Sequence, residues 1–316
     1  MPSLGAIEGV ITALVTPFDV YGRIDKVVFR DLIAYQLAAG VRGVLVGGGS
    51  GEYLSLLPEE RLQLVETAAE AASGRFPVIA GILEPGTAAA RETARSLEEA
   101  GASALLVLTP YYFNPSADGI MAHFETVAGA TSLPILLYNN PARTNLNLAA
   151  QLLRRLSEIE NVVGIKECDR DIGRVSTKIE AVEDRLTFMA GDDDLLLPML
   201  LVGARGGVMA SPNLVPEWAV ELLDAYADRD LSRCRDIQVR IARLLNLFYG
   251  PNHPGPLKQA LGHLGWPVGL PRLPLAPLDA KEVLELVRGL ESLGLRPREA
   301  RGRASMRGAA SHTRRS

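Results

Sequence analysis

The 316-residue sequence is poor in cysteine and aromatic residues and has no long apolar run. Its two cysteines, Cys168 and Cys234, are far apart and match no metal-binding or redox spacing, so a reducing cytoplasm is the expected location. No apolar stretch approaches the length of a membrane span, and no signal-like segment begins the chain, so export is not expected. What remains is an ordinary globular composition, 47% hydrophobic and 22% charged.

Basic residues are scarce in most of the chain. The net charge is −4, but seven of the 33 basic residues and only one of the 37 acidic residues lie in residues 296–316. The 26 basic and 36 acidic residues that remain give residues 1–295 a net charge of −10, which disfavours nucleic-acid binding there. The 296–316 segment, rich in Arg, Ser, Gly and Ala, is predicted to be a basic, disordered tail.

Apolar runs alternate with helical patterns along the first 228 residues. Strands are predicted at residues 9–16, 41–47, 77–81, 104–109, 134–138, 161–166, 186–190 and 207–210, with a helix after each. The strands are apolar throughout and not alternately polar, which is typical of strands buried on both faces. Eight such units predict an α/β fold in which a parallel sheet closes into a (β/α)8 barrel. A doubly wound open sheet is the alternative, but residues 16–22 lack its glycine fingerprint.

After residue 212 the pattern is helical, with helices predicted at residues 216–228, 231–248, 256–262 and 279–293. The first of these completes the barrel. We therefore expect a catalytic barrel at residues 1–228, a C-terminal helical domain at 229–295 and the basic tail at 296–316. The connector at 266–277 is rich in proline, which favours an extended wrap over a flexible linker.

The strand at residues 161–166 ends on a lysine, Lys166. Its other side chains are mostly β-branched, so Lys166 leaves an apolar layer at the carboxyl end of a buried strand. A lysine amine is nucleophilic only when neutral, and apolar surroundings lower a lysine pKa enough for Schiff-base formation with a carbonyl substrate. A strand-end lysine that reaches water is the alternative interpretation.

Polar residues follow the two preceding strands. Tyr111 and Tyr112 follow the fourth strand, Tyr138 ends the fifth, and Arg143 comes five residues later. In a barrel these are positions on the catalytic face. A tyrosine hydroxyl near a Schiff-base lysine can shuttle protons, and an arginine can clamp a carboxylate. Each tyrosine alone is more typical of a packed aromatic, but Lys166 on the next strand favours the catalytic interpretation.

Residues 47–52 form a glycine-rich turn after the second strand, with the sequence Gly-Gly-Gly-Ser-Gly-Glu. The turn lacks the ending of a nucleotide-binding P-loop and the spacing of a dinucleotide fingerprint. Its backbone N–H groups can nevertheless hold a small carboxylate, with the Ser50 hydroxyl as an extra donor. A purely structural tight turn is the alternative.

Three consecutive acids, Asp192 to Asp194, follow the seventh strand and could indicate a divalent metal site. We favour a structural interpretation, because acids in the first turn of a helix are stabilised by capping and by the helix dipole. The four histidines are scattered without ligand spacing. No metal is therefore predicted.

Taken together, these motifs resemble the pyruvate-dependent Schiff-base lyase family of dihydrodipicolinate synthase and N-acetylneuraminate lyase, over about residues 7–293. The resemblance implies a (β/α)8 barrel with a C-terminal helical appendix, assembled as a homotetramer (a dimer of dimers) without a metal or organic cofactor. It also implies catalytic roles: Lys166 as the Schiff-base lysine, Tyr138 as the proton shuttle, and Tyr112 completing the relay in a neighbouring subunit's site.

The same resemblance implies a substrate-binding set. Gly49 and Ser50 would hold the pyruvate carboxylate, and Arg143 would bind the carboxylate end of the second substrate. Gly191 and Met209, at the ends of the seventh and eighth strands, complete the set.

The sequence also departs from the synthases of this family. They usually carry threonine where this chain has Gly49, and its hydroxyl links the two tyrosines, so the relay here is one hydroxyl short unless Ser50 or a water replaces it. The glycine turn is more similar to that of the family's deoxy-keto-sugar-acid dehydratases. Cys168 and Met209 also stand where the synthases usually carry other residues.

We therefore predict a cytoplasmic Schiff-base lyase that condenses pyruvate or another 2-oxo acid with an aldehyde such as aspartate semialdehyde. The alternative within the family is an aldolase or dehydratase that uses Lys166 on a 2-keto-3-deoxy-sugar acid. A non-catalytic metabolite-binding barrel is a third possibility. The expected partners are a small-molecule substrate and further copies of the chain, with neither nucleic acid nor membrane.

Regulation by lysine is not expected. Lysine-inhibited members of the family bind free lysine with polar residues that match Tyr53, Pro85 and Ala89 of this chain, and only the tyrosine at Tyr111 is kept. A bound ammonium and carboxylate need charge-assisted partners, which these positions do not supply.

Overall fold

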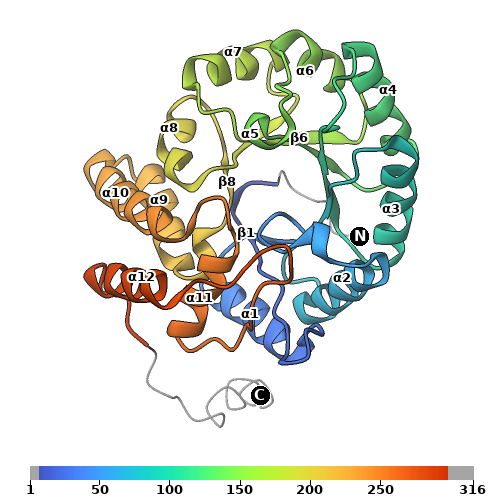
Figure 1. Cartoon of the computed structure of the whole chain (residues 1–316). Helices are drawn as coiled ribbons and strands as arrows, with labels where there is room; N and C mark the ends of the chain where they lie inside the picture. Colours follow the sequence, from blue (N-terminus) through green and yellow to red (C-terminus); the bar gives the residue numbers. More distant parts are fainter. Residues whose placement is uncertain (1–6, 298–316) are drawn as a thin grey trace, which may run out of the picture.

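A computed structural model of the chain describes residues 7–297, within which eight parallel strands form a closed barrel (Figure 1). Each strand pairs with the next in the chain, and β8 pairs with β1. The strands are β1 (Gly9–Ala13), β2 (Gly43–Val46), β3 (Val78–Ile82), β4 (Ala104–Leu108), β5 (Ile135–Asn139), β6 (Val162–Glu167), β7 (Thr187–Ala190) and β8 (Gly206–Met209). The predicted barrel is confirmed, the open sheet is excluded, and the strands differ from the prediction only at their ends.

A ring of helices surrounds the barrel (Figure 1). Its members are α1 (Lys26–Ala38), α2 (Pro58–Ala72), α3 (Thr87–Glu99), α4 (Ala117–Ala128), α6 (Ala150–Leu156), α7 (Ile172–Val182), α8 (Leu196–Leu201) and α9 (Pro216–Ala227). Short turns that the sequence did not indicate lie above the strand ends: η1 (Tyr53–Ser55), α5 (Pro141–Thr144), η2 (Asp193–Leu195) and η3 (Ser211–Asn213). Asp25 caps α1 by accepting hydrogen bonds from two backbone amides, as its position before the helix predicts.

Two buried clusters divide the strand side chains between the inside and the outside of the barrel. Alternate positions point inward and fill the barrel with residues such as Ile11, Leu45, Ile79, Leu106 and Val208. The intervening positions point outward and pack against the helices. This alternation decides which strand residues can reach a cavity at the barrel's open end.

The C-terminal appendix packs on one side of the barrel. It consists of α10 (Leu231–Phe248), α11 (Gly255–His263) and α12 (Ala280–Ser292), and α10 lies against α8 and α9 (Figure 1). The proline-rich connector 266–277 crosses the loop after β1, where the Val268 carbonyl accepts a 3.0 Å hydrogen bond from the Phe18 amide. Residues 298–316 of the predicted basic tail lie outside the described residues.

Across residues 7–297, no helix combines the length and the apolar character that a membrane crossing requires.

Candidate active site

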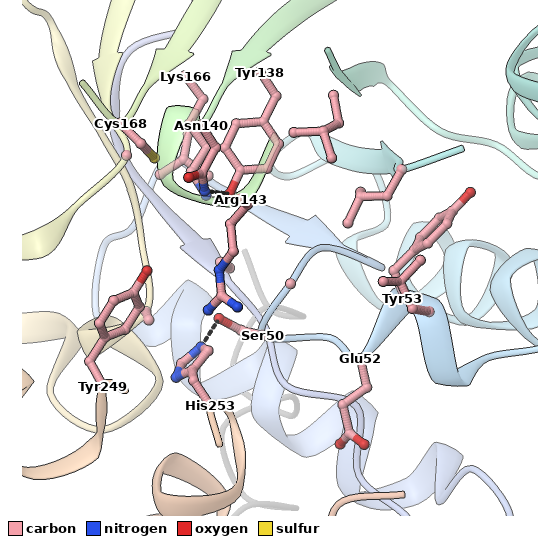
Figure 2. A pocket seen from close by; sticks show the side chains of 18 of the residues that line it. Ser50, Glu52, Tyr53, Tyr138, Asn140, Arg143, Lys166, Cys168, Tyr249 and His253 are labelled. Carbon is pink, nitrogen blue, oxygen red and sulfur yellow. Dashed lines mark hydrogen bonds between the residues drawn. The ribbon is translucent and has the colours of Figure 1, made fainter. Parts of the chain in front are cut away.

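A cavity of about 330 Å³ opens at the carboxyl ends of the strands. It is lined from nearly every strand end, and residues of the appendix close one side (Figure 2). Most of the predicted site residues line it, namely Gly49, Ser50, Tyr138, Arg143, Lys166 and Gly191. Positions spread over 142 residues of sequence therefore meet in one space, because parallel strands in a barrel share one carboxyl edge.

Lys166 and Tyr138 form the buried centre of the cavity. They end neighbouring strands and are Cα partners in the β5–β6 ladder. Lys166 is 7% exposed and Tyr138 is 8% exposed, and the lysine Nζ lies 4.5 Å from the centre of the tyrosine ring. An amine and a phenol are thus held side by side in largely apolar surroundings, which is the arrangement that covalent catalysis by lysine requires.

The Tyr138 hydroxyl has a partner that the sequence analysis did not identify. Asn140 Nδ2 donates a 3.0 Å hydrogen bond to this hydroxyl (Figure 2). Burial is the main cause that raises the pKa of Tyr138 well above its usual value, and Cys168 and Asp192 act in the same direction. The phenol therefore stays protonated around neutral pH, and its proton remains available for transfer to a substrate.

The glycine-rich turn approaches β3 so closely that Gly81 has no room for a side chain. A Cβ at Gly81 would lie 2.2 Å from the carbonyl oxygen of Gly47. At Gly49, by contrast, an added Cβ would have no atom within 4 Å. The missing side chain at Gly49 therefore leaves open space in the lining of the cavity.

Ser50 is held from the appendix. Its Oγ lies 2.9 Å from Nε2 of His253, which follows α10 and was not among the predicted site residues (Figure 2). Loss of hydration on burial is the main cause that lowers the pKa of His253 to about 4, so the ring is neutral at neutral pH. No local sequence signal points to this contact, because the two residues are 203 positions apart.

A buried ion pair supports the same turn from behind. Lys258 Nζ on α11 lies 2.9 Å from Glu52 Oε1, and both side chains are fully buried. Lys258 also donates to the backbone carbonyls of Thr16 and Leu270, and the Arg272 amide donates to Glu52 Oε2 over 2.7 Å. In Figure 2 the Glu52 carboxylate points away from the cavity. The appendix and the proline-rich connector thereby fix the end of the glycine turn.

Arg143 reaches into the cavity from α5, between Tyr138 and Ser50 (Figure 2). Its side chain is exposed, and within residues 7–297 no carboxylate lies within ion-pair distance of its guanidinium. An arginine without a protein partner in a cavity is free to receive a substrate carboxylate.

Two predicted residues do not line the cavity. Met209 is fully buried in the outer cluster between the strands and the helices, and its neighbours Val208 and Ala210 line the cavity instead. The Met209 side chain faces the helices because side chains of a strand alternate between its two faces, and the role of Met209 in substrate binding stays a prediction. Tyr112 is 90% exposed and points away, whereas Tyr111 lines the cavity.

The three acids after β7 are engaged by protein groups. Asp193 accepts hydrogen bonds from the amides of Ala210 and Ser211, over 3.1 and 2.6 Å. Asp192 and Asp194 both pair with Arg170. The expected capping by these acids is not seen, since Asp192 makes no capping bond, and Asp193 instead ties η2 to the end of β8.

Gly191 and Cys168 meet where β6 and β7 end. A Cβ at Gly191 would lie 2.2 Å from the Cys168 sulfur, so only glycine allows this approach. Burial is the first cause that raises the pKa of Cys168 well above its usual value, which keeps this thiol protonated and unreactive. Among residues 7–297, no cluster of three or more His, Cys, Asp or Glu side chains is arranged to hold a metal ion.

A (β/α)8 barrel whose catalytic edge carries a buried lysine beside a protonated tyrosine defines an enzyme class, the lyases that work through a lysine Schiff base. Comparison with known proteins agrees with this class. The sequence profile of the dihydrodipicolinate synthetase family matches residues 6–293. The 4-hydroxy-tetrahydrodipicolinate synthase of Archaeoglobus fulgidus is 35% identical over 288 residues, which covers 91% of this chain and 99% of that protein.

Other relatives give the same result. The 4-hydroxy-tetrahydrodipicolinate synthase of Methanothrix thermoacetophila is 37% identical over 280 residues, covering 88% of this chain and 94% of that protein. The crystal structure of a dihydrodipicolinate synthase from Bacillus anthracis superposes with a TM-score of 0.88 at 33% identity, covering 90% of this chain and 98% of that one. The chain belongs to the dihydrodipicolinate synthetase family.

Proposed function

We propose that Lys166 forms an imine with pyruvate or another 2-oxo acid, and that the resulting enamine adds to an aldehyde such as aspartate semialdehyde. The observation that carries this proposal is the buried pair of Lys166 and Tyr138 at the carboxyl edge of the barrel. The names of the relatives, 4-hydroxy-tetrahydrodipicolinate synthases, support the same reaction.

The steps follow from the groups in the cavity. The Lys166 amine attacks the keto carbon and gives up its proton, and the resulting carbinolamine loses water when its oxygen receives a proton. Loss of a proton from the adjacent carbon then gives the enamine, whose carbon attacks the aldehyde. Tyr138 carries these protons, and the Asn140 amide holds its hydroxyl in place. The lysine supplies the covalent chemistry, so the proposed reaction uses neither a metal nor an organic cofactor.

The ends of the substrates have separate binding groups. In this proposal the glycine turn and Ser50 bind the carboxylate of the 2-oxo acid through backbone amides and a hydroxyl. Arg143, exposed in the cavity and without an ion pair to any residue of 7–297, binds the carboxylate of the second substrate. Gly191 contributes by keeping the wall at β7 close to Cys168 and free of a side chain.

A second candidate function is favoured by the lining opposite Lys166. Gly49 leaves open space in the wall, and Ser50 and His253 offer a neutral polar pair there. Such a surface suits the hydroxyl groups of a 2-keto-3-deoxy-sugar acid, which the same lysine would cleave or dehydrate. The covalent step is shared by both functions, and only the substrate differs.

We also propose that the protein acts in the cytoplasm as a homo-oligomer, a dimer of dimers. Tyr112 and Phe113 are exposed and pack edge to face at a 5.4 Å centroid distance, and a second copy would cover them and receive Tyr112 near its own cavity. Light scattering measures this assembly. We further propose residues 1–228 as the catalytic barrel and residues 229–295 as a helical domain that supplies His253 and Lys258 to it.

The shared step and the substrate need separate measurements. Incubation with pyruvate and borohydride, followed by peptide mass analysis, should find a reduced adduct on Lys166, and none should form on a Lys166→Met variant. A wild-type protein without an adduct from pyruvate or other 2-oxo acids would contradict both candidate functions. A coupled assay with aspartate semialdehyde, run beside a panel of 2-keto-3-deoxy-sugar acids, then separates the two.

A further inference from the structure

A buried group of charged and amide side chains lies on the outer side of β5 and β6, behind the catalytic cavity. Its centre is Lys178 on α7, whose Nζ lies 2.7 Å from Asn147 Oδ1, 2.9 Å from Glu167 Oε2 and 3.2 Å from Asp169 Oδ2. Lys178 and Glu167 are each 1% exposed. None of these four side chains lines the cavity, so the proposed reaction leaves their burial unexplained.

The group is in register with the catalytic pair. Tyr138 and Lys166 are Cα partners across β5 and β6, and the next partners along the same ladder are Asn139 and Glu167. Because successive strand side chains point to opposite faces, the first pair faces the cavity and the second faces the helices. Asn139 Nδ2 donates a 2.6 Å hydrogen bond to Glu167 Oε1. This bond joins the two strands one residue beyond the pair that performs the chemistry.

The backbone ladder alone does not give these strands one continuous register. The pairing of β5 with β6 shifts between Ile135 and Leu136, at the opposite end from the cavity. At the cavity end, Asn139 is further fixed by the Leu148 amide, which donates to its Oδ1 over 3.0 Å. The side-chain group therefore adds a second set of bonds where the alignment of the strands matters for catalysis.

Lys178 compensates the charge of the group. Burial, the largest cause, raises the pKa of Glu167, and the adjacent Lys178 acts in the opposite direction. Asp169 has a second cation, because Arg174 donates to its two oxygens over 2.6 and 3.1 Å. Among residues 7–297, Lys178 is the only cation in ion-pair contact with Glu167. Without that cation the buried carboxylate would have to take up a proton or draw in water, and either change disturbs its bond to Asn139.

We propose that Lys178 is a positioning residue for the reaction: through Glu167 and Asn139 it holds Lys166 and Tyr138 in the relative placement that imine formation needs. The proposal rests on the proposed role of Lys166. Misplacement of a reacting group by about 1 Å can lower a rate roughly 10²-fold. For Lys178→Met we expect imine formation at saturating pyruvate to slow about tenfold or more, with the half-saturating pyruvate concentration nearly unchanged.

The test measures the rate of borohydride-trapped adduct on Lys166 against pyruvate concentration, well below the lowest Tm of the proteins compared. Gln36→Leu is the matched control, because Gln36 is equally buried and its amide group bonds to two distant groups, the Thr12 hydroxyl on β1 and the Pro212 carbonyl. Neither partner lies on β5 or β6, and none of the three residues lines the cavity. We expect the control to retain both the wild-type trapping rate at saturation and the wild-type half-saturating pyruvate concentration.

Two further variants keep the proposal open to refutation if Lys178→Met does not fold. Asn139→Ala leaves the ion pair intact and removes the link between strands, and it should slow the same step. The double variant E167Q/K178M removes both charges but keeps an amide for Asn139, and it should recover part of the rate. Wild-type trapping rates in folded Lys178→Met or Asn139→Ala, or equal slowing in Gln36→Leu, would overturn the proposal. Absence of an adduct in the wild type would instead contradict the proposed function.

Discussion

Lys166 Nζ lies 4.5 Å from the centre of the Tyr138 ring, and the two residues are direct partners in neighbouring strands. The proposed nucleophile and the proposed proton carrier are therefore held together by the barrel itself and not by a loop that must close. Regular parallel strands vary little in position, so this pair is preorganised before substrate binds. Each prediction below follows from this pair or from the groups that surround it.

Replacing Tyr138 with Phe should lower kcat by roughly 10²–10⁴, the usual contribution of a positioned proton-transfer group. The ring and its packing are kept, so the free energy of unfolding should change little. Steady-state kinetics with the identified substrate gives the comparison. Tyr226→Phe is a suitable control, because this tyrosine donates to the Leu200 carbonyl far from the cavity. A Tyr138→Phe enzyme with wild-type kcat would exclude the phenol from the proton transfers.

Replacing Arg143 with Ala should separate the two half-reactions. The guanidinium makes no ion pair within the described part of the chain, and we assign it to the second substrate's carboxylate. The variant should still form the borohydride-trapped pyruvate adduct while condensation is lost, and Arg143→Lys should recover little because lysine lacks the planar fork. If adduct formation and condensation fall equally, Arg143 has a structural role instead.

Free lysine should not inhibit the enzyme. Arg61 pairs with Glu84 over 2.5 Å, its guanidinium carbon lies 3.8 Å from the centre of the Tyr53 ring, and both charged groups act on the nearby Tyr111. A bound lysine would have to break this ion pair, which is costly for partly buried charges. Activity should be constant in a lysine titration. Inhibition below about 1 mM, equivalent to roughly −4 kcal/mol of binding, would contradict this expectation.

Stability should fall in mild acid because of His253. Burial lowers the pKa of His253 in the folded protein to about 4, below the value of about 6.5 in an unfolded chain. The unfolded state therefore takes up this proton first, so the stabilisation is complete above about pH 6.5 and is lost as pH falls toward 4. The side chain is only partly buried, and we expect protonation of this group to lower the free energy of unfolding by about 2 kcal/mol.

The measurement is denaturant unfolding of the wild type and of His253→Gln between pH 7.5 and pH 4. Carboxylates titrate in the same range, so only the difference between the two proteins reports His253. The difference in the free energy of unfolding between the wild type and His253→Gln should shrink as the pH falls. Parallel curves for the two proteins would show that His253 does not titrate with a lowered pKa.

Much of the fold was readable from short segments. The strands were predicted from apolar runs of four to eight residues separated by helical patterns, and the Asp25 cap of α1 appears where its position before that helix predicts. The candidate site followed from the same reading, because the carboxyl ends of parallel strands must share one edge. The sequence alone therefore places Lys166 and Tyr138 at neighbouring strand ends.

Two features of the site could not be predicted from the sequence. One is the face of a strand on which a side chain lies, and the other is contact between residues far apart in the chain. The family resemblance indicates Met209 as a substrate-binding residue without indicating which face of β8 its side chain occupies, and in the structure that side chain lies in the outer cluster while Val208 and Ala210 line the cavity. The Ser50–His253 contact joins the barrel to the appendix across 203 positions. No periodicity in either segment encodes that contact.

The sequence by itself determined the order and period of the elements, the closed parallel barrel and the chemistry of its strand ends, because these depend on neighbouring residues and on the geometry that parallel strands share. Only the tertiary structure decided what supports that chemistry: the imidazole of His253 at Ser50, and the buried Lys178 behind Lys166. Such contacts form when the chain has folded and desolvation makes a partner necessary for every buried charge, and the choice of partner depends on distances in space that the order of residues does not record.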